Sequence, residues 1–371
     1  ETMGFDGYSV LMRDAAVSDY PEADLSRVID WLCRDAPQTA APSSTPSPAT
    51  RETAAVPGGR ESAVFTGETG LFGILTEPET PSAGGAAFLM LNTGANHHIG
   101  TNRLSVMIAR RLVREGLTVL RVDLRGLGES PSAPDRPDRT ILDTRMVPEV
   151  CDAVDFLAKR GHREIVVNGL CAGGWLAYHA TLAEPRITGQ LLLNIQNLWM
   201  KGSLAREAPS NREYLRKSRS KETWLRLVRG DVNLHIVIAT LATRFAEAVA
   251  IRLHRAVTRA RGAETLVEKT RRMLGAVAAR GARTAFFFNR EDEGLDEMEV
   301  HFGREGRALA DVPGVNIMII DDGDHIFSIK SSRDGLLELM AAQFPDGRFV
   351  PTMAHASPAP RATATLQSQT A

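Results

Sequence analysis

The sequence has little cysteine and no long apolar run, and each absence excludes a class of protein. Three cysteines (Cys33, Cys151 and Cys171) in 371 residues are too few and too scattered for a disulfide framework or a cysteine zinc site. No uninterrupted apolar run reaches the length of about 18 residues that a membrane span needs. The low cysteine content and the lack of a recognisable signal peptide predict a cytoplasmic protein.

An excess of charge is also lacking, since 44 basic and 45 acidic residues leave a net charge of −1. The overall charge therefore gives no sign of a nucleic-acid or membrane partner. With 43% hydrophobic and 24% charged residues, the composition is typical of a soluble, globular protein.

Composition divides the chain into four parts. Residues 1–36 contain one helical apolar stripe, and residues 37–60 are rich in Pro, Ala, Ser and Thr, as flexible linkers are. Residues 61–350 form the expected folded domain. Residues 351–371 have the composition of a disordered tail.

Within the folded domain, short apolar strands alternate with amphipathic helices. This alternation predicts a mostly parallel sheet that is covered by helices on both faces. The expected strands are 86–92, 117–124, 164–170, 189–195, 283–289 and 315–321.

Residues 196–282 interrupt this alternation and have no strand signal. Their apolar residues favour several helices, which we interpret as a cap over the carboxyl ends of the strands. The segment is rich in arginine and lysine. Two interpretations of this charge stay open: a solvated helical surface without a ligand, or a positive rim that attracts an anionic substrate or carrier.

The stretch IVVNGLCAGGW, residues 165–175, places Cys171 at a turn between a strand and a helix. This is the pattern of a nucleophile elbow, with Cys in the place of Ser. Gly169 and Gly173 fit it because side chains at those positions would collide with the strained turn. The start of a helix also favours a thiolate. We expect Cys171 to be a nucleophile; the alternative is a small structural residue at a tight bend.

A general base and an orienting acid are expected on loops at the same end of the sheet. His325, in IIDDGDHIFSIK, follows the last predicted strand, and its place after Cys171 matches the order of this fold. Asp292 follows the preceding strand and is the expected acid, with Asp296 as the second choice.

The oxyanion formed in such a reaction needs backbone N–H donors. We expect them from Ala172 and from Gly94 or Ala95, which lie on the loop after the first strand of the predicted alternation.

His97, His98 and Trp175 are the candidates for substrate contact, and helix capping is the alternative role for the two histidines. The histidine pair has no carboxylate at metal-ligand spacing in the sequence, so we predict no metal. The stretch DLRGLGES, residues 123–130, lacks the third glycine of a dinucleotide fingerprint. No cofactor is therefore predicted.

Five stretches carry a family resemblance: FGILTEP, LMLNTGANHHIGTNR, ARRLVREGLTVLRVDLRGLGES, NGLCAGG and DDGDHIF. Together they resemble serine aminopeptidase-like α/β hydrolases, including the bacterial hydrolases found beside exosortase systems. The resemblance covers about residues 62–345. It implies an α/β-hydrolase fold and acyl chemistry by a nucleophile–acid–histidine triad, at Cys171, Asp292 and His325. This sequence departs from the family in having Cys where most members have Ser.

Residues 4–32 also resemble the final segment of a related hydrolase. Two interpretations stay open: the chain begins inside a tandem protein, or the segment is an N-terminal helix that packs on the folded domain.

We therefore expect an enzyme that acts on ester or thioester bonds through an S-acyl intermediate on Cys171, as a hydrolase, thioesterase or acyltransferase. The expected substrate is a small acyl compound, with acyl carrier protein or coenzyme A as the candidate carriers. One alternative is a non-catalytic α/β-hydrolase-fold protein that binds a ligand or partner. Another is a redox sensor in which Cys171 acts with Cys151.

Overall fold

The computed structural model divides into two units, Glu1–Thr50 and Arg51–Ala371. The first unit contains helix α2 (Glu22–Cys33), where the sequence predicts one, and its buried Asp24 accepts a hydrogen bond from the Gly7 N–H at 2.6 Å. The structure describes Gly7, 21–34, 53–82, 85–196, Leu198, 257–258, 260–321 and 323–351.

The second unit is built on one nine-stranded sheet, in the order β1-β2-β3-β5-β4-β6-β7-β8-β9. The strands β1, β2, β3 and β5 pair in antiparallel fashion, and every pairing from β5 to β9 is parallel. The predicted, mostly parallel sheet is thus confirmed. The strands are Thr53–Val56 (β1), Gly59–Thr66 (β2), Leu71–Pro78 (β3), Ala87–Met90 (β4), Thr118–Val122 (β5), Ile165–Leu170 (β6), Ile187–Leu193 (β7), Arg283–Asn289 (β8) and Val315–Ile320 (β9).

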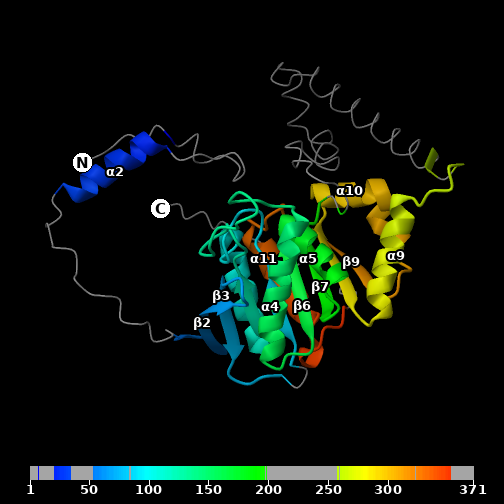
Figure 1. Ribbon diagram of the computed structural model, residues 1–371, viewed down its shortest axis with the longest axis horizontal. Helices are drawn as coiled ribbons and strands as arrows, with labels where there is room; N and C mark the ends of the chain where they lie inside the picture. Colours follow the sequence, from blue (N-terminus) through cyan, green and yellow to red (C-terminus); the bar gives the residue numbers. More distant parts are fainter. Residues whose placement is uncertain are drawn as a thin grey trace, which may run out of the picture. The chain divides into compact units, whose positions relative to one another are not determined.

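Helices cover both faces of this sheet, as the runs of apolar residues in its strands require. Strand β4 shows the pattern: Leu89 joins one core cluster, and its neighbours Phe88 and Met90 join the other. The first cluster takes in residues of α4, α5, α9 and α10, and the second takes in residues of α3 and α11. Figure 1 shows α4 and α5 side by side against the sheet. The helices are Leu104–Leu112 (α3), Val147–Lys159 (α4), Ala172–Ala183 (α5), Leu266–Ala279 (α9), Glu293–Phe302 (α10) and Lys330–Ala342 (α11).

Two predicted boundaries differ from the structure. Residues 53–60, assigned to the flexible linker 37–60, form β1 and the start of β2. Helix α9, assigned to the cap 196–282, instead buries Leu274 and Val277 beside the sheet as the crossover helix into β8. The cap residues 201–256, the linker residues 35–52 and the tail 352–371 lie outside the described residues.

Between β8 and β9, helix α10 is followed by a 3₁₀ segment, Arg304–Leu309, whose Leu309 is fully buried in the same core as α9. Within the described ranges, no helix combines the length and the apolar character needed to cross a membrane.

Candidate active site

Cys171 occupies a strained turn between β6 and α5. Its backbone angles, φ 56° and ψ −116°, are ones that residues with a side chain rarely adopt. The turn is fixed by the hydrogen bond from the Cys171 N–H to the Leu193 carbonyl at 2.9 Å. This geometry is that of a nucleophile elbow, which presents the tip residue at the carboxyl end of the sheet.

The two flanking glycines are required by close backbone contacts. A Cβ at Gly169 would lie 2.0 Å from the carbonyl carbon of Gly173. A Cβ at Gly173 would lie 2.4 Å from the carbonyl oxygen of Asn92. Neither neighbour is a flexible side chain that could move aside. The glycine pattern in the sequence therefore reflects a real steric limit. The close contact at Gly173 also allows the loop after β4 to lie against the first turn of α5.

His325 and Asp292 lie in direct contact. The His325 Nδ1 and the Asp292 Oδ2 are 2.6 Å apart. The Asp292 side chain is fully buried, and its other oxygen, Oδ1, accepts the Gly294 N–H at 2.7 Å as the N-cap of α10. Of the two acids considered from the sequence, Asp292 is the one that meets His325, whereas Asp296 follows within α10.

Cys171 lies close enough to the His325 imidazole to affect its pKa, which connects the three groups. Because Nδ1 faces Asp292, Nε2 is the atom left for the sulfur. Burial alone would lower the pKa of His325, but the hydrogen bonds to Asp292 and Cys171 and the negative charges of these groups raise it well above its usual value. The arrangement favours the imidazolium form of His325 beside Cys171. The N-terminal dipole of α5, which starts after Cys171, favours negative charge at this position.

Two buried asparagines hold the His325 loop, and the sequence analysis missed both. The Asn194 Nδ2 donates to the His325 carbonyl at 2.8 Å, and its Oδ1 accepts the Asn289 N–H at 2.8 Å. The Asn289 side chain in turn donates to the Asp324 carbonyl. Each asparagine ends an apolar strand segment, LLLN or FFFN, and that position is the signal that could have identified them.

The N–H groups predicted for the oxyanion lie on the two segments that Gly173 brings together. Ala172 is the first residue of α5, so its N–H has no acceptor within the helix. Gly94, with φ 54°, and Ala95 occupy a turn closed by the bond from the Asn96 N–H to the Thr93 carbonyl at 3.0 Å. Within the part of the chain that the structure describes, neither the Gly94 nor the Ala95 N–H has a hydrogen-bond acceptor.

Trp175 does not have the position expected of a substrate contact. It is only 4% exposed, belongs to the core cluster beside the sheet and contacts His179, with ring centroids 4.1 Å apart and the ring planes tilted by 49°. Because α5 is buried on nearly all sides, its apolar pattern does not distinguish one face of the helix from another. Its burial indicates a packing role.

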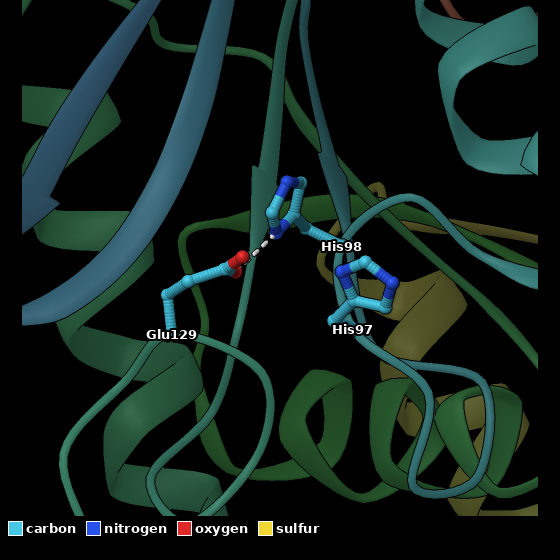
Figure 2. A group of neighbouring side chains, drawn as sticks. All are labelled: His97, His98 and Glu129. Carbon is cyan, nitrogen blue, oxygen red and sulfur yellow. Dashed lines mark ion pairs between the residues drawn. The ribbon is translucent and has the colours of Figure 1, made fainter. Parts of the chain in front are cut away.

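His98 is mainly a structural residue of the loop after β4. Its Nδ1 lies 2.9 Å from the Asp123 Oδ2, and its side chain is 9% exposed. His97 is exposed. A carboxylate does lie beside this pair in the structure, although the sequence spacing did not show it. It belongs to Glu129, on the loop after β5, which lies next to His98 (Figure 2).

A profile of the Alpha/beta hydrolase family matches residues 88–339, which include the elbow, the acid and the histidine. The chain belongs to this family. No curated protein sequence matches the chain.

Several solved structures are similar to this chain at low sequence identity. A Pyrococcus furiosus esterase, Pf2001, is 12% identical, with a TM-score of 0.47 over 76% of this chain and 91% of its own. A Mycobacterium smegmatis proline iminopeptidase is 17% identical, with a TM-score of 0.46 over 76% and 97%. A thioesterase domain from the curacin biosynthetic pathway is 13% identical, with a TM-score of 0.41 over 76% and 98%.

Proposed function

We propose that this α/β hydrolase is an acyl-transfer enzyme that acts on ester or thioester bonds through an S-acyl intermediate on Cys171. The observation that carries the proposal is the set of Cys171 on the elbow, His325 beside it and Asp292 in contact with the His325 Nδ1. A nucleophile, a base and an orienting acid in this order are the parts that acyl transfer requires.

Acylation begins from the Cys171 thiolate, whose proton is held by His325. The sulfur attacks the carbonyl carbon of the substrate, and the carbonyl oxygen becomes an oxyanion. The N–H of Ala172 and an N–H of the Gly94–Ala95 turn donate hydrogen bonds to it. When the intermediate collapses, the alcohol or thiol leaves and takes the proton from His325. The acyl group remains on the sulfur.

Deacylation reverses these roles. Water or another acceptor gives its proton to His325 as it attacks the thioester carbon, and the Cys171 thiolate departs. Asp292 stays ionised throughout and stabilises the imidazolium. The acceptor decides the product: water gives hydrolysis, and an amine, alcohol or thiol gives transfer.

The cysteine supports esters and thioesters as substrates over the peptides that serine aminopeptidase-like relatives cleave. A thiolate is a better leaving group than an unprotonated amine, so cleavage of an amide depends on full protonation of the nitrogen by His325 as it departs. With an ester or a thioester, the substrate leaving group can depart. The S-acyl enzyme that results stays reactive toward several acceptors.

An anionic carrier is the expected form of the substrate. This part of the proposal rests on the basic composition of residues 196–282, most of which lie outside the described residues. A positive surface raises the local concentration and the association rate of a negative partner. Acyl carrier protein and coenzyme A are carriers of that kind. We expect KM for such substrates to rise with salt while kcat stays constant.

The test is turnover of short and long acyl-coenzyme A and of aryl esters by the wild type, Cys171→Ala and Cys151→Ala. Cys151 is the matched control, because it is a half-buried cysteine on α4. We expect Cys171→Ala to lose about 10⁴-fold or more in rate and Cys151→Ala to keep it. Equal rates in the wild type and Cys171→Ala would overturn the proposal. No turnover of any donor, together with slow alkylation of Cys171 by iodoacetamide, would favour the non-catalytic binding protein.

A further inference from the structure

Three side chains with metal-binding atoms meet beside the loop after β4. His97 and His98 belong to that loop, and Glu129 belongs to the loop after β5 (Figure 2). One ligand atom from each of the three lies within 4.8 Å of the others. The His98 Nδ1 and the Glu129 Oε2 are 3.0 Å apart. The three atoms are therefore close enough to share one ion.

A second carboxylate converges on the same ring nitrogen. The Asp123 Oδ2 lies 2.9 Å from the His98 Nδ1, the same nitrogen that lies 3.0 Å from the Glu129 Oε2. One N–H cannot fully satisfy two carboxylate oxygens. A metal ion bound at this nitrogen in place of the proton removes that competition.

The backbone of the cluster is fixed before any ion binds. The Asp123 Oδ1 accepts the His98 N–H at 2.6 Å and the Asn92 Nδ2 at 2.8 Å. The Asp123 Oδ2 accepts the Glu129 N–H at 3.1 Å. One buried carboxylate thus holds the main chains of two of the three converging residues. Such support of ligands by neighbouring groups is what metal sites need.

We propose that His97, His98 and Glu129 bind one zinc ion, with Asp123 supplying the second negative charge next to it. Zinc accepts imidazole nitrogen and carboxylate oxygen together, whereas magnesium and calcium prefer oxygen alone. Zinc ligands stand about 3.3 Å apart at bond lengths of about 2.0–2.1 Å, so the 3.0 Å between the His98 Nδ1 and the Glu129 Oε2 needs to widen by only a few tenths of an ångström. The His97 nitrogen lies within 4.8 Å of both, and its exposed side chain can adjust. The Glu129 side chain is 53% exposed and has room to move. The ion replaces the proton at the His98 Nδ1.

Zinc binding would join the loop after β4 to the loop after β5. The first of these loops also carries Gly94 and Ala95, so the ion would stabilise the segment that holds them. This role is structural, and no step of the proposed reaction passes through the metal. The proposed zinc site does not depend on the proposed acyl chemistry.

The test is titration of the chelator-treated, tag-free full chain with Zn²⁺ by calorimetry, and with Co²⁺ by visible absorption. His97→Gln and Glu129→Gln are compared with the wild type. His301→Gln is the matched control, because His301 and Glu297 form another histidine–carboxylate pair on α10, at 2.9 Å. We expect one Zn²⁺ per chain, the d–d bands of tetrahedral Co²⁺, an affinity at least about tenfold lower in each of the first two variants and no change in the control.

The inference is overturned if the wild type takes up no zinc at micromolar concentration, or if His97→Gln and Glu129→Gln bind zinc as the wild type does. Thermal melts of the metal-free variants show whether they are folded. Alkylation of Cys171 by iodoacetamide is measured on the same samples, and it should be equal in all of them. A failure of the metal site is thereby distinguished from a failure of the acyl chemistry.

Discussion

The two carboxylate oxygens of Asp292 have different partners, His325 and the N-terminus of α10. One oxygen lies 2.6 Å from the His325 Nδ1, and the other accepts the Gly294 N–H at 2.7 Å. The same side chain therefore orients the imidazole and caps a helix. The helix fixes the direction from which the acid approaches the histidine.

Asp292→Asn separates these two roles. Asparagine caps a helix about as well as aspartate, so we expect the fold to survive. It cannot stabilise an imidazolium by charge, and its amide favours the wrong tautomer of His325. The rate should fall by about 10³–10⁴-fold. Steady-state kinetics test this, with Asp296→Asn as the control of unchanged rate. A larger loss of rate in Asp296→Asn than in Asp292→Asn would identify Asp296 as the orienting acid.

The raised pKa of His325 predicts a pH-dependent contribution to stability. A folded-state pKa above the unfolded value of about 6.5 means that the stabilisation is complete below pH 6.5 and is lost as the pH rises through the folded pKa. The difference in the free energy of unfolding between the wild type and His325→Gln should therefore shrink from pH 6.5 upward. Urea unfolding at a series of pH values measures it. A difference that grows with pH would contradict the assigned direction.

The elbow glycines should be intolerant of a single methyl group. Gly173→Ala places a Cβ 2.4 Å from the Asn92 carbonyl oxygen, and we expect a loss of about 3 kcal/mol or more in the free energy of unfolding. Gly275→Ala on α9 is the matched control, since a Cβ there meets nothing within 4 Å. That change should stabilise the protein by about 0.5–1 kcal/mol. Equal stability of the two variants would mean that the turn relaxes easily.

Asn194→Ala should loosen the loop that carries His325. The carbonyl of His325 and the buried N–H of Asn289 each lose a partner, which costs about 1–3 kcal/mol of stability. Because the imidazole is then less well positioned, kcat should fall about 10–100-fold while KM changes little. A loss of stability without any change in kcat would restrict Asn194 to a structural role.

Local patterns in the sequence predicted the central part of the fold. The strand β6 and the elbow were identified because apolar runs and steric limits at Gly169 and Gly173 act within a few residues. The antiparallel strands β1, β2 and β3 were not predicted. The first of them is short and mostly exposed and follows a stretch of linker composition.

Contacts between distant segments could not be predicted in this way. His98 meets Asp123 and Glu129 only because β4 and β5 are neighbours in the sheet, which brings the loops that follow them together. Asn194 reaches the His325 loop for the same kind of reason, across the ends of β7 and β8. The order of these residues along the chain does not show the order of the strands in the sheet.

The most direct test of the central claim is intact-protein mass spectrometry after brief exposure to an acyl thioester. The account predicts that the wild type gains the mass of one acyl group, that Cys171→Ala gains none, and that peptide mapping places the group on Cys171. Release of the adduct by added thiols, amines or water would then identify the acceptor. An unmodified wild type, or an equal adduct on Cys171→Ala, would contradict the account.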